Sequence, residues 1–209
     1  MSTSIEISPE LVKALREQTK VGVMECKKAL SEAGGDLEKA VEILRKKGAA
    51  TATKKASREA KEGIVASYIH LGGKVGVLVE VNCETDFVAK NEGFREFVKD
   101  ITLQIAAGSP QCVSRDQVPE SVLAKEKEIL MDQLKADPKN AKKPAEILEK
   151  IVAGRLDKFF STACLLEQAF VKNPDQTIKD LLTAKVAEIG ENIVIRRFVR
   201  FQVGEGIES

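Results

Sequence analysis

Histidine and the large aromatic residues are scarce in this chain of 209 residues, which contains one histidine, one tyrosine and no tryptophan. A single histidine, His70, excludes most catalytic constellations that depend on histidine within one chain. The shortage of aromatic rings also argues against stacking platforms for single-stranded nucleic acid. The composition therefore favours neither histidine-based catalysis nor single-strand binding.

Long apolar runs and clustered cysteines are missing as well. No stretch is long enough to span a bilayer, and residues 1–8 contain no apolar signal core. The four cysteines are widely separated, and no two of them have the short spacing of metal ligands: Cys26, Cys83, Cys112 and Cys164. We expect reduced thiols in a cytoplasmic protein with no membrane partner, no metal and no cofactor.

An excess of charge of either sign is also absent, because 33 basic residues face 32 acidic ones. The chain as a whole therefore gives no electrostatic reason for a nucleic-acid partner. A local imbalance exists in residues 45–61, where seven basic residues accompany the single acidic residue Glu59. We expect Lys54, Lys55 and Arg58 in this segment to form a solvated linker, for which a partly helical conformation is open.

Residues 8–48 have the pattern of three short helices. Ser8-Pro9 is a favourable helix start, since the hydroxyl can cap and proline lacks only an N–H that would be unpaired. Gly34-Gly35 ends the second helix, and Asp36 can cap a third that ends at Gly48. The apolar stripe of the second helix is expected to comprise Val23, Cys26, Leu30 and Ala33.

The rest of the chain mixes strands and helices. Residues 64–71 and 74–81 predict a hairpin around Gly72-Gly73, where a turn needs positive φ. A helix follows, then two helical runs at about 120–136 and 144–159 that predict an antiparallel hairpin. A further helix at about 177–189 and a strand at 193–201 complete an α+β fold. We divide the chain into a module at 1–48, a basic linker at 49–62 and a core at 63–209 that includes the helical hairpin at about 120–159.

The most informative segment is the string Asn82-Cys83-Glu84-Thr85-Asp86-Phe87-Val88-Ala89-Lys90-Asn91, which follows the apolar run 75–81. An aromatic ring beside a carboxylate, where a strand gives way to a helix near Glu92, suits contact with another protein. Two other roles are open from spacing alone. Phe87 can fill the core beneath the hairpin, and Asp86 can cap the helix at Glu92.

This string resembles the signature of the bacterial elongation factor Ts family, which exchanges nucleotide on the GTPase elongation factor Tu. The resemblance extends in order over nearly the whole chain. It includes the segments 11–16, 23–30, 187–197 and 203–208. It implies that the module at 1–48 has a ubiquitin-associated-like fold, and that the chain binds elongation factor Tu in its GDP-bound and nucleotide-free states.

The resemblance also implies roles for particular residues. Thr85, Asp86, Phe87 and Val88 would enter the GTPase beside its nucleotide and dislodge Mg²⁺. Three residues of the amino-terminal module, Arg16, Val23 and Met24, would contact the same partner, and His70 is a further possible contact. From spacing alone, Met24 could equally belong to the core of the module. No bond is made or broken by such a factor, so it is not an enzyme.

Longer family members have two related core halves and an extra carboxy-terminal helix. This sequence has room for one half and ends soon after residues 203–206. The resemblance therefore implies a homodimer, for which the strand 193–201 would offer an edge.

Two alternatives predict different behaviour. In a binding adaptor, residues 1–48 would suffice for the main interaction and Phe87 would be dispensable. In an RNA-associated factor, binding would weaken steeply with salt and would depend on Lys54, Lys55 and Arg58.

Overall fold

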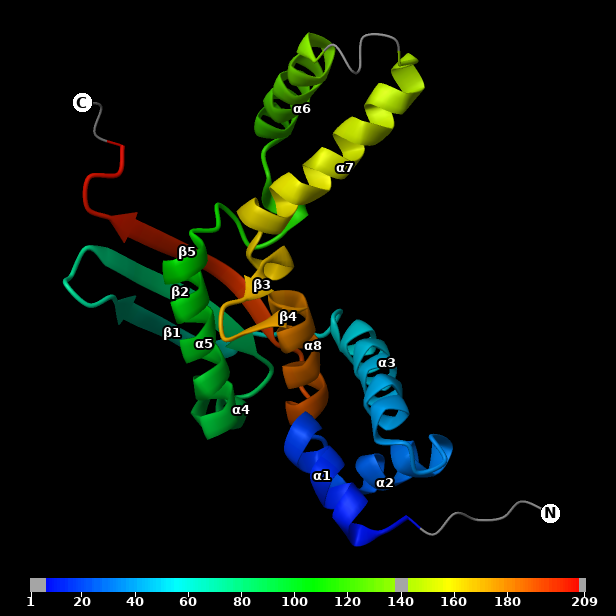
Figure 1. Ribbon diagram of the computed structural model, residues 1–209. Helices are drawn as coiled ribbons and strands as arrows, with labels where there is room; N and C mark the ends of the chain where they lie inside the picture. The colour runs from blue at the N-terminus through cyan, green and yellow to red at the C-terminus, as the bar shows by residue number, and fades with distance from the viewer. Residues whose placement is uncertain (1–6, 138–142, 207–209) are drawn as a thin grey trace. The chain divides into compact units, whose positions relative to one another are not determined.

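The computed structural model describes residues 7–137 and 143–206. The chain divides into two compact units, one of Met1–Ile64, Val81–Phe97 and Asp180–Val194, the other of Val65–Glu80, Val98–Lys179 and Ile195–Ser209. Helices and antiparallel strands confirm the α+β class (Figure 1). The helices are α1 (Pro9–Thr19), α2 (Val23–Glu32), α3 (Leu37–Lys55), α4 (Asp86–Lys90), α5 (Glu92–Gly108), α6 (Glu120–Ala136), α7 (Ala145–Ala163) and α8 (Ile178–Ile189). The strands are β1 (Glu62–Ile69), β2 (Val75–Cys83), β3 (Ala169–Phe170), β4 (Asn173–Thr177) and β5 (Val194–Gln202), with short 3-10 turns at Arg115–Gln117 and Leu165–Glu167.

The three amino-terminal helices begin where their capping residues predict. The Ser8 hydroxyl accepts the N–H of Leu11 at 3.3 Å, and Asp36 accepts the N–H of Lys39 at 3.0 Å. Gly34 and Gly35 both have positive φ after α2, which an L side chain would resist. One apolar cluster joins the helices: Val12, Leu15, Cys26, Ala29, Leu30, Ala40 and Leu44. The likeness of this module to a ubiquitin-associated fold stays a prediction.

Two expectations for this region are wrong. Val23 is 47% exposed and does not belong to the buried stripe of α2. Helix α3 does not end at Gly48 but continues to Lys55, so the first part of the expected linker is helical. The reason is that Gly48 is buried within reach of Ala187, while Lys55 donates a hydrogen bond to the carbonyl of Gly190. Contacts distant in sequence thus stabilise a turn of helix that a glycine would weaken.

The main sheet has the strand order β1-β2-β5, so β5 lies at an edge as expected. Gly72 and Gly73 have φ values of 88° and 68°, which confirms the predicted turn. The His70 N–H donates to the Val75 carbonyl at 2.9 Å, so the connection is longer than a two-residue turn. At the far end of β5 the Val203 N–H donates to the Lys74 carbonyl at 2.9 Å, as antiparallel pairing with β2 requires.

One face of this sheet is covered and the other is open. Val77 and Val79 are buried, as are Val98 and Ile101 of α5, whereas Leu78 is 46% exposed. On β5 the Arg200 guanidinium donates to the Ala106 carbonyl of α5, so the odd-numbered residues 197, 199 and 201 point away from α5. We call the uncovered side the open sheet face. Its exposed apolar residues are Val65, Ile69, Leu78, Val199 and Phe201.

Helices α6 and α7 pack against each other as the predicted hairpin (Figure 1). Their shared cluster contains Leu130, Leu134, Val152, Leu156, Phe160 and Cys164. Helix α7 continues past residue 159 to Ala163 because Phe160 and Ala163 are also buried. Part of the expected connection, residues 138–142, lies outside the described residues.

All four thiols are free, although two of them lie close together. The sulfur atoms of Cys112 and Cys164 are 3.6 Å apart, a proximity that their separation in sequence does not suggest. Burial raises the pKa of Cys83 to about 11 and that of Cys164 to about 12. Both thiols are therefore protonated at neutral pH, and they are poor nucleophiles.

Gly63 provides a test of the β1–β2 pairing. Its φ is 140°, and an added Cβ would lie 2.2 Å from the Val81 carbonyl oxygen and 2.7 Å from the Asn82 Cα. Since those are backbone atoms, Gly63→Ala should lower the free energy of unfolding by at least about 2 kcal/mol. The control is Gly154→Ala in α7, where an added Cβ meets nothing within 4 Å and where alanine should stabilise by up to about 1 kcal/mol.

Urea unfolding at one fixed protein concentration measures both variants. Equal stability of Gly63→Ala and the wild type would contradict this account of the strand pairing.

Candidate functional site

Phe87 lies on α4, a five-residue helix that directly follows β2 and that the sequence did not predict as a separate element. Thr85 is the residue that caps this helix, and its hydroxyl oxygen accepts the Val88 N–H at 3.4 Å. Val88 is half-buried and Ala89 is buried, which holds one side of α4 against the protein. The Phe87 side chain points away and is 81% exposed. The alternative in which Phe87 fills the core is therefore wrong.

Asp86 stands beside Phe87 as the first residue of α4 and is also exposed. The Lys90 ammonium donates to its carboxylate at 2.7 Å, and this hydrogen bond lowers the pKa of Asp86. The carboxylate is therefore ionised at neutral pH. The alternative role of Asp86 as a helix cap is wrong, because the Asn91 side chain accepts the Phe94 N–H at 3.2 Å at the start of α5. An exposed ring and an exposed charge thus occupy adjacent positions.

Sequence reasoning missed the residues that hold α4. Glu191 accepts hydrogen bonds from the Thr85 hydroxyl at 2.7 Å and from the backbone N–H groups of Glu84 and Thr85, both at 3.0 Å. Lys90 was also not singled out. The only signal for Glu191 was its place in the segment 187–197, where the resemblance assigned it no role.

The basic residues after Gly48 were expected to be solvated, but two of them make contacts within the protein. Arg58 lies 3.5 Å from the Glu84 carboxylate, and its carbonyl accepts the side-chain amide of Asn192 at 2.8 Å. The Lys55 ammonium donates a hydrogen bond to the carbonyl of Gly190. Two of the three residues that an RNA-binding linker would use are therefore engaged within the protein.

The three predicted contact residues of the amino-terminal module lie at the junction of α1 and α2. Arg16 is in the last turn of α1 and is exposed. Val23 and Met24 begin α2 and are 47% and 66% exposed. The alternative that places Met24 in the module core is wrong. All three side chains are available at one end of the helical module.

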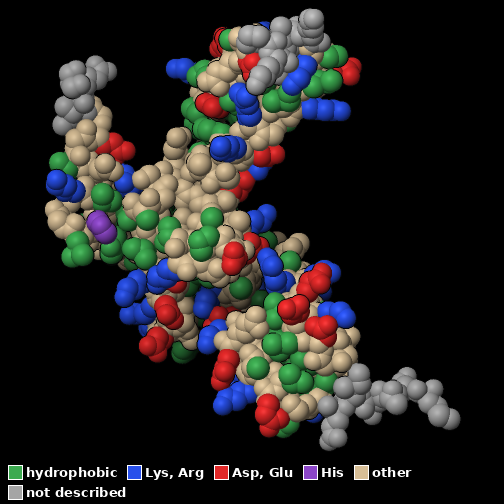
Figure 2. Space-filling view, in the orientation of Figure 1, with side chains coloured by type: hydrophobic (Ala, Val, Ile, Leu, Met, Phe, Trp, Pro, Cys, Tyr) green, Lys and Arg blue, Asp and Glu red, His purple; other side chains and the backbone are tan. Residues whose placement is uncertain are grey.

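His70 lies at the end of β1 in the second unit and is exposed. Its Nδ1 is 2.9 Å from the Tyr68 hydroxyl, and the two ring centroids are 6.0 Å apart. Figure 2 shows hydrophobic side chains gathered around this single histidine at the end of the β1–β2 hairpin. His70 is therefore accessible at the end of the hairpin, and its role as a contact stays a prediction.

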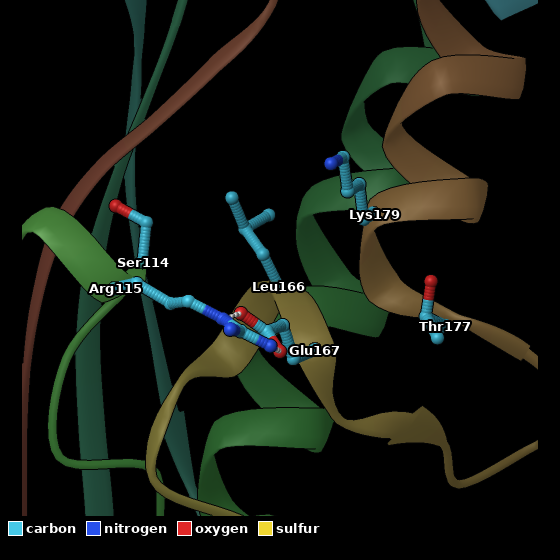
Figure 3. Close-up of a pocket in the computed structure, with 6 residues that line it drawn as sticks. All are labelled: Ser114, Arg115, Leu166, Glu167, Thr177 and Lys179. Atoms are coloured by element: carbon cyan, nitrogen blue, oxygen red, sulfur yellow. Dashed lines mark hydrogen bonds and ion pairs between the residues drawn. The ribbon is translucent and has the colours of Figure 1, made fainter. Parts of the chain in front are cut away.

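A pocket of about 510 Å³ lies in the second unit and contains none of the predicted site residues (Figure 3). Arg115 extends across it and pairs with Glu167, and with Asp157 at 2.9 Å. These carboxylates raise the pKa of Arg115, and its guanidinium lies 4.3 Å above the Phe160 ring. The guanidinium is thus already neutralised and stacked, which leaves little for an anionic ligand.

The described residues contain neither a metal-ligand cluster nor a helix that could span a membrane. Over residues 7–137 and 143–206, no three His, Cys, Asp or Glu side chains are grouped so that they could hold a metal ion. Within the same residues, no helix combines the length and the apolar character needed to cross a membrane.

Comparison with known proteins gives one consistent result. The sequence model of the family described as Elongation factor TS matches residues 9–205. The chain is 60% identical over 201 residues to elongation factor Ts of Carboxydothermus hydrogenoformans, covering 96% of this chain and 91% of that protein. It is 59% identical to elongation factor Ts of Thermodesulfovibrio yellowstonii, with coverage of 95% and 97%. Against elongation factor Ts of an Anaeromyxobacter species the identity is 61%, with coverage of 98% and 91%.

Proposed function

The chain belongs to the elongation factor Ts family, and from that premise we propose that it is a guanine-nucleotide exchange factor for elongation factor Tu. It acts in translation elongation, in the cytoplasm, and it forms and breaks no covalent bond. The observation that carries the proposal is the 81% exposure of Phe87 on a short, anchored helix. An apolar ring that is so exposed is unfavourable in water, and its burial in a partner protein would be favourable.

Phe87 acts as the wedge. Transfer of a phenylalanine side chain from water to an apolar site contributes roughly 1.5–3 kcal/mol. That free energy offsets the displacement of elements of the GTPase that surround its nucleotide. Thr85 and Val88 set the direction of the ring, since both take part in the hydrogen bond that starts α4.

Asp86 brings a carboxylate to the phosphate side of the nucleotide site of the partner. There it competes for the groups that hold Mg²⁺ and the phosphates of GDP. Loss of Mg²⁺ removes the main countercharge of the β-phosphate, so GDP leaves faster. Lys90 neutralises Asp86 in the free protein, where it lies 2.7 Å away, and it must release the carboxylate when the partner binds.

The energetics follow from linkage. A GDP complex of nanomolar affinity holds about 12 kcal/mol of binding free energy. The exchange factor removes a few kcal/mol of it, and the nucleotide weakens the binding of the factor by the same amount. GTP in excess then displaces the factor, which binds both the GDP-bound and the nucleotide-free GTPase.

Further contacts enlarge the interface. We infer that Arg16, Val23 and Met24 bind elongation factor Tu at the exposed junction of α1 and α2. Two exposed apolar side chains beside a guanidinium are a common composition of protein–protein contacts. His70 is a minor contact of the same partner. The adaptor alternative is less well supported, because it leaves the exposure of Phe87 without a purpose.

A second copy of the chain covers the open sheet face. Five exposed apolar side chains on one side of a three-stranded sheet form a surface that a monomer seldom leaves in water. The ion pair between Glu80 and Arg197, with a separation of 2.7 Å, lies on the same side and would fix the register of the two copies. We therefore propose a homodimer.

Release of a fluorescent GDP from elongation factor Tu, followed by stopped flow, tests the function. We expect the protein to accelerate release in proportion to its concentration. Phe87→Ala should lose most of this acceleration, which separates the proposal from an adaptor, in which Phe87 would be dispensable. Binding that depends steeply on salt and requires RNA would instead support the RNA-associated alternative. An unchanged GDP release rate at saturating protein would refute the proposal.

A further inference from the structure

Glu191 is not among the residues proposed to touch elongation factor Tu, yet it makes the largest set of hydrogen bonds to the start of α4. We propose that Glu191 is a positioning residue for Phe87. Together with Glu84 it forms a clamp that holds α4 in its projecting orientation before the partner arrives. This inference rests on the proposed function, because it concerns the delivery of the same ring.

The Glu191 carboxylate occupies the amino-terminal end of α4. One of its oxygens accepts the N–H groups of Glu84 and Thr85, and the other accepts the Thr85 hydroxyl. These two N–H groups immediately precede α4, and a negative charge at this end of a helix is favourable. Glu191 therefore pairs the donors that lead into α4 and adds its charge where the helix dipole favours it.

The contact is reciprocal. The Glu84 carboxylate accepts the backbone N–H of Asn192 at 2.6 Å, so each of the two glutamates accepts a backbone N–H from the segment that carries the other. Arg58 lies 3.5 Å from the Glu84 carboxylate and neutralises part of the charge that two neighbouring carboxylates bring. The Asn192 amide in turn donates to the Arg58 carbonyl. Three segments that are distant in sequence, around Arg58, Glu84 and Glu191, thus contact one another next to the start of α4.

Gly190 explains how Glu191 reaches this position. It follows α8 with φ of 83°, a left-handed conformation that reverses the chain at the end of a helix. Its N–H donates to the Val186 carbonyl at 2.9 Å, and its own carbonyl accepts the Lys55 ammonium. The loop after α8 is therefore held on both sides, and Glu191 extends from a fixed backbone.

Helix α4 needs such support, because it is too short to be stable by itself. Isolated helices shorter than about 12–15 residues are marginal in water, and α4 has five residues. Ala89 is its only buried residue and Val88 is half-buried, so apolar packing holds α4 on one side only. Two further hydrogen bonds reach α4 and its capping residue: the Arg95 guanidinium donates to the Ala89 carbonyl at 3.3 Å, and the Cys83 thiol donates to the Thr85 carbonyl at 3.2 Å.

Orientation matters because Phe87 has to enter a defined site. A ring that is already in place loses little conformational freedom on binding, whereas a ring on a loose segment loses more. Phe87 is two residues after Thr85, and both the N–H and the hydroxyl of Thr85 donate hydrogen bonds to Glu191. Removal of the carboxylate should therefore misplace the ring without changing the ring itself.

The test compares Glu191→Ala and Glu191→Gln with the control Glu188→Ala in stopped-flow GDP release. Glu188 lies three residues earlier in the chain, in the last turn of α8, and its carboxylate pairs with Lys185 at 2.7 Å. We expect Glu191→Ala to reduce the acceleration by between about tenfold and 100-fold. Glu191→Gln keeps one acceptor oxygen and the shape of the side chain, so its acceleration of GDP release should lie between those of Glu191→Ala and the wild type. Glu188→Ala should accelerate release as the wild type does.

Two further readouts separate positioning from general support of the fold. Amide hydrogen exchange of Glu84 and Thr85 in the free protein should become at least about tenfold faster in Glu191→Ala, while the amides of α5 keep their protection. The double variant with Phe87→Ala should release GDP no more slowly than Phe87→Ala alone, because the clamp acts only through the ring. If Glu191→Ala does not fold, Glu191→Gln carries the same comparison.

The outcomes are distinct. Wild-type exchange by Glu191→Ala, or additive losses in the double variant, would overturn the positioning role while leaving the exchange function intact. If Phe87→Ala itself exchanges like the wild type, the proposed function fails, whatever the result at Glu191.

Discussion

Phe87→Ala is expected to slow the stimulated release of GDP from elongation factor Tu by an order of magnitude or more. The ring is 81% exposed in the free protein, so nearly all of its apolar surface is available for burial in the partner. Burial of such a side chain contributes roughly 1.5–3 kcal/mol, and about 1.4 kcal/mol corresponds to a factor of ten. The fold should be intact, because the ring makes little contact with its own molecule.

Stopped-flow measurement with a fluorescent GDP decides the matter, with circular dichroism to verify the fold. Ile147→Ala is the matched control, since Ile147 is 45% exposed on α7, outside every proposed contact. It should exchange like the wild type. Asp86→Ala should slow GDP release by a similar factor to Phe87→Ala, because it removes the carboxylate proposed to compete for the groups that hold Mg²⁺, although it keeps the ring. Wild-type rates for both α4 variants would discard the wedge mechanism.

Leu78→Glu should convert a homodimer into a monomer. Leu78 is on the central strand of the sheet, in the middle of the open sheet face, where it is 46% exposed. A glutamate there would be buried without a partner when two copies associate. An uncompensated buried charge costs several kcal/mol, so the dissociation constant of the dimer should rise by at least about 100-fold.

Size-exclusion chromatography with light scattering measures the mass of each variant over a range of concentrations. Ile147→Glu is the control, because it introduces the same charge at similar exposure outside the sheet. A wild type that is monomeric at high micromolar concentration would contradict the proposal, as would a dimer that survives Leu78→Glu. Exchange activity of the monomeric variant would then show whether one copy suffices.

Short-range patterns in this chain were reliable. The caps Ser8 and Asp36 and the hairpin glycines Gly72 and Gly73 act within a few residues of their own positions. Five large apolar residues of α5 recur at helical spacing, and they are buried as that spacing indicates: Phe94, Phe97, Val98, Ile101 and Ile105. Local hydrogen bonds and helical periodicity depend on neighbours in the sequence, so they are visible in it.

The errors share one cause. Helix α3 passes Gly48 because Lys55 finds an acceptor 135 residues away. Val23 has helical spacing with buried residues, but no element covers it. The hydroxyl of Thr85 binds a carboxylate 106 residues further along the chain. None of these features can be recognised from the neighbouring residues in the sequence, because each depends on which distant segments the fold brings together.

Residue order alone was enough for the α+β class, the starts of α1 and α3, the glycine turn of the hairpin and the family, since these depend on local chemistry and on motifs that can be compared letter by letter. It could not show which apolar side chains stay in water. Exposure of Phe87 and Met24, the open sheet face and the clamp at Glu191 depend on what packs against each residue. That is a property of the assembled fold, because burial is settled by contacts between segments far apart in the chain.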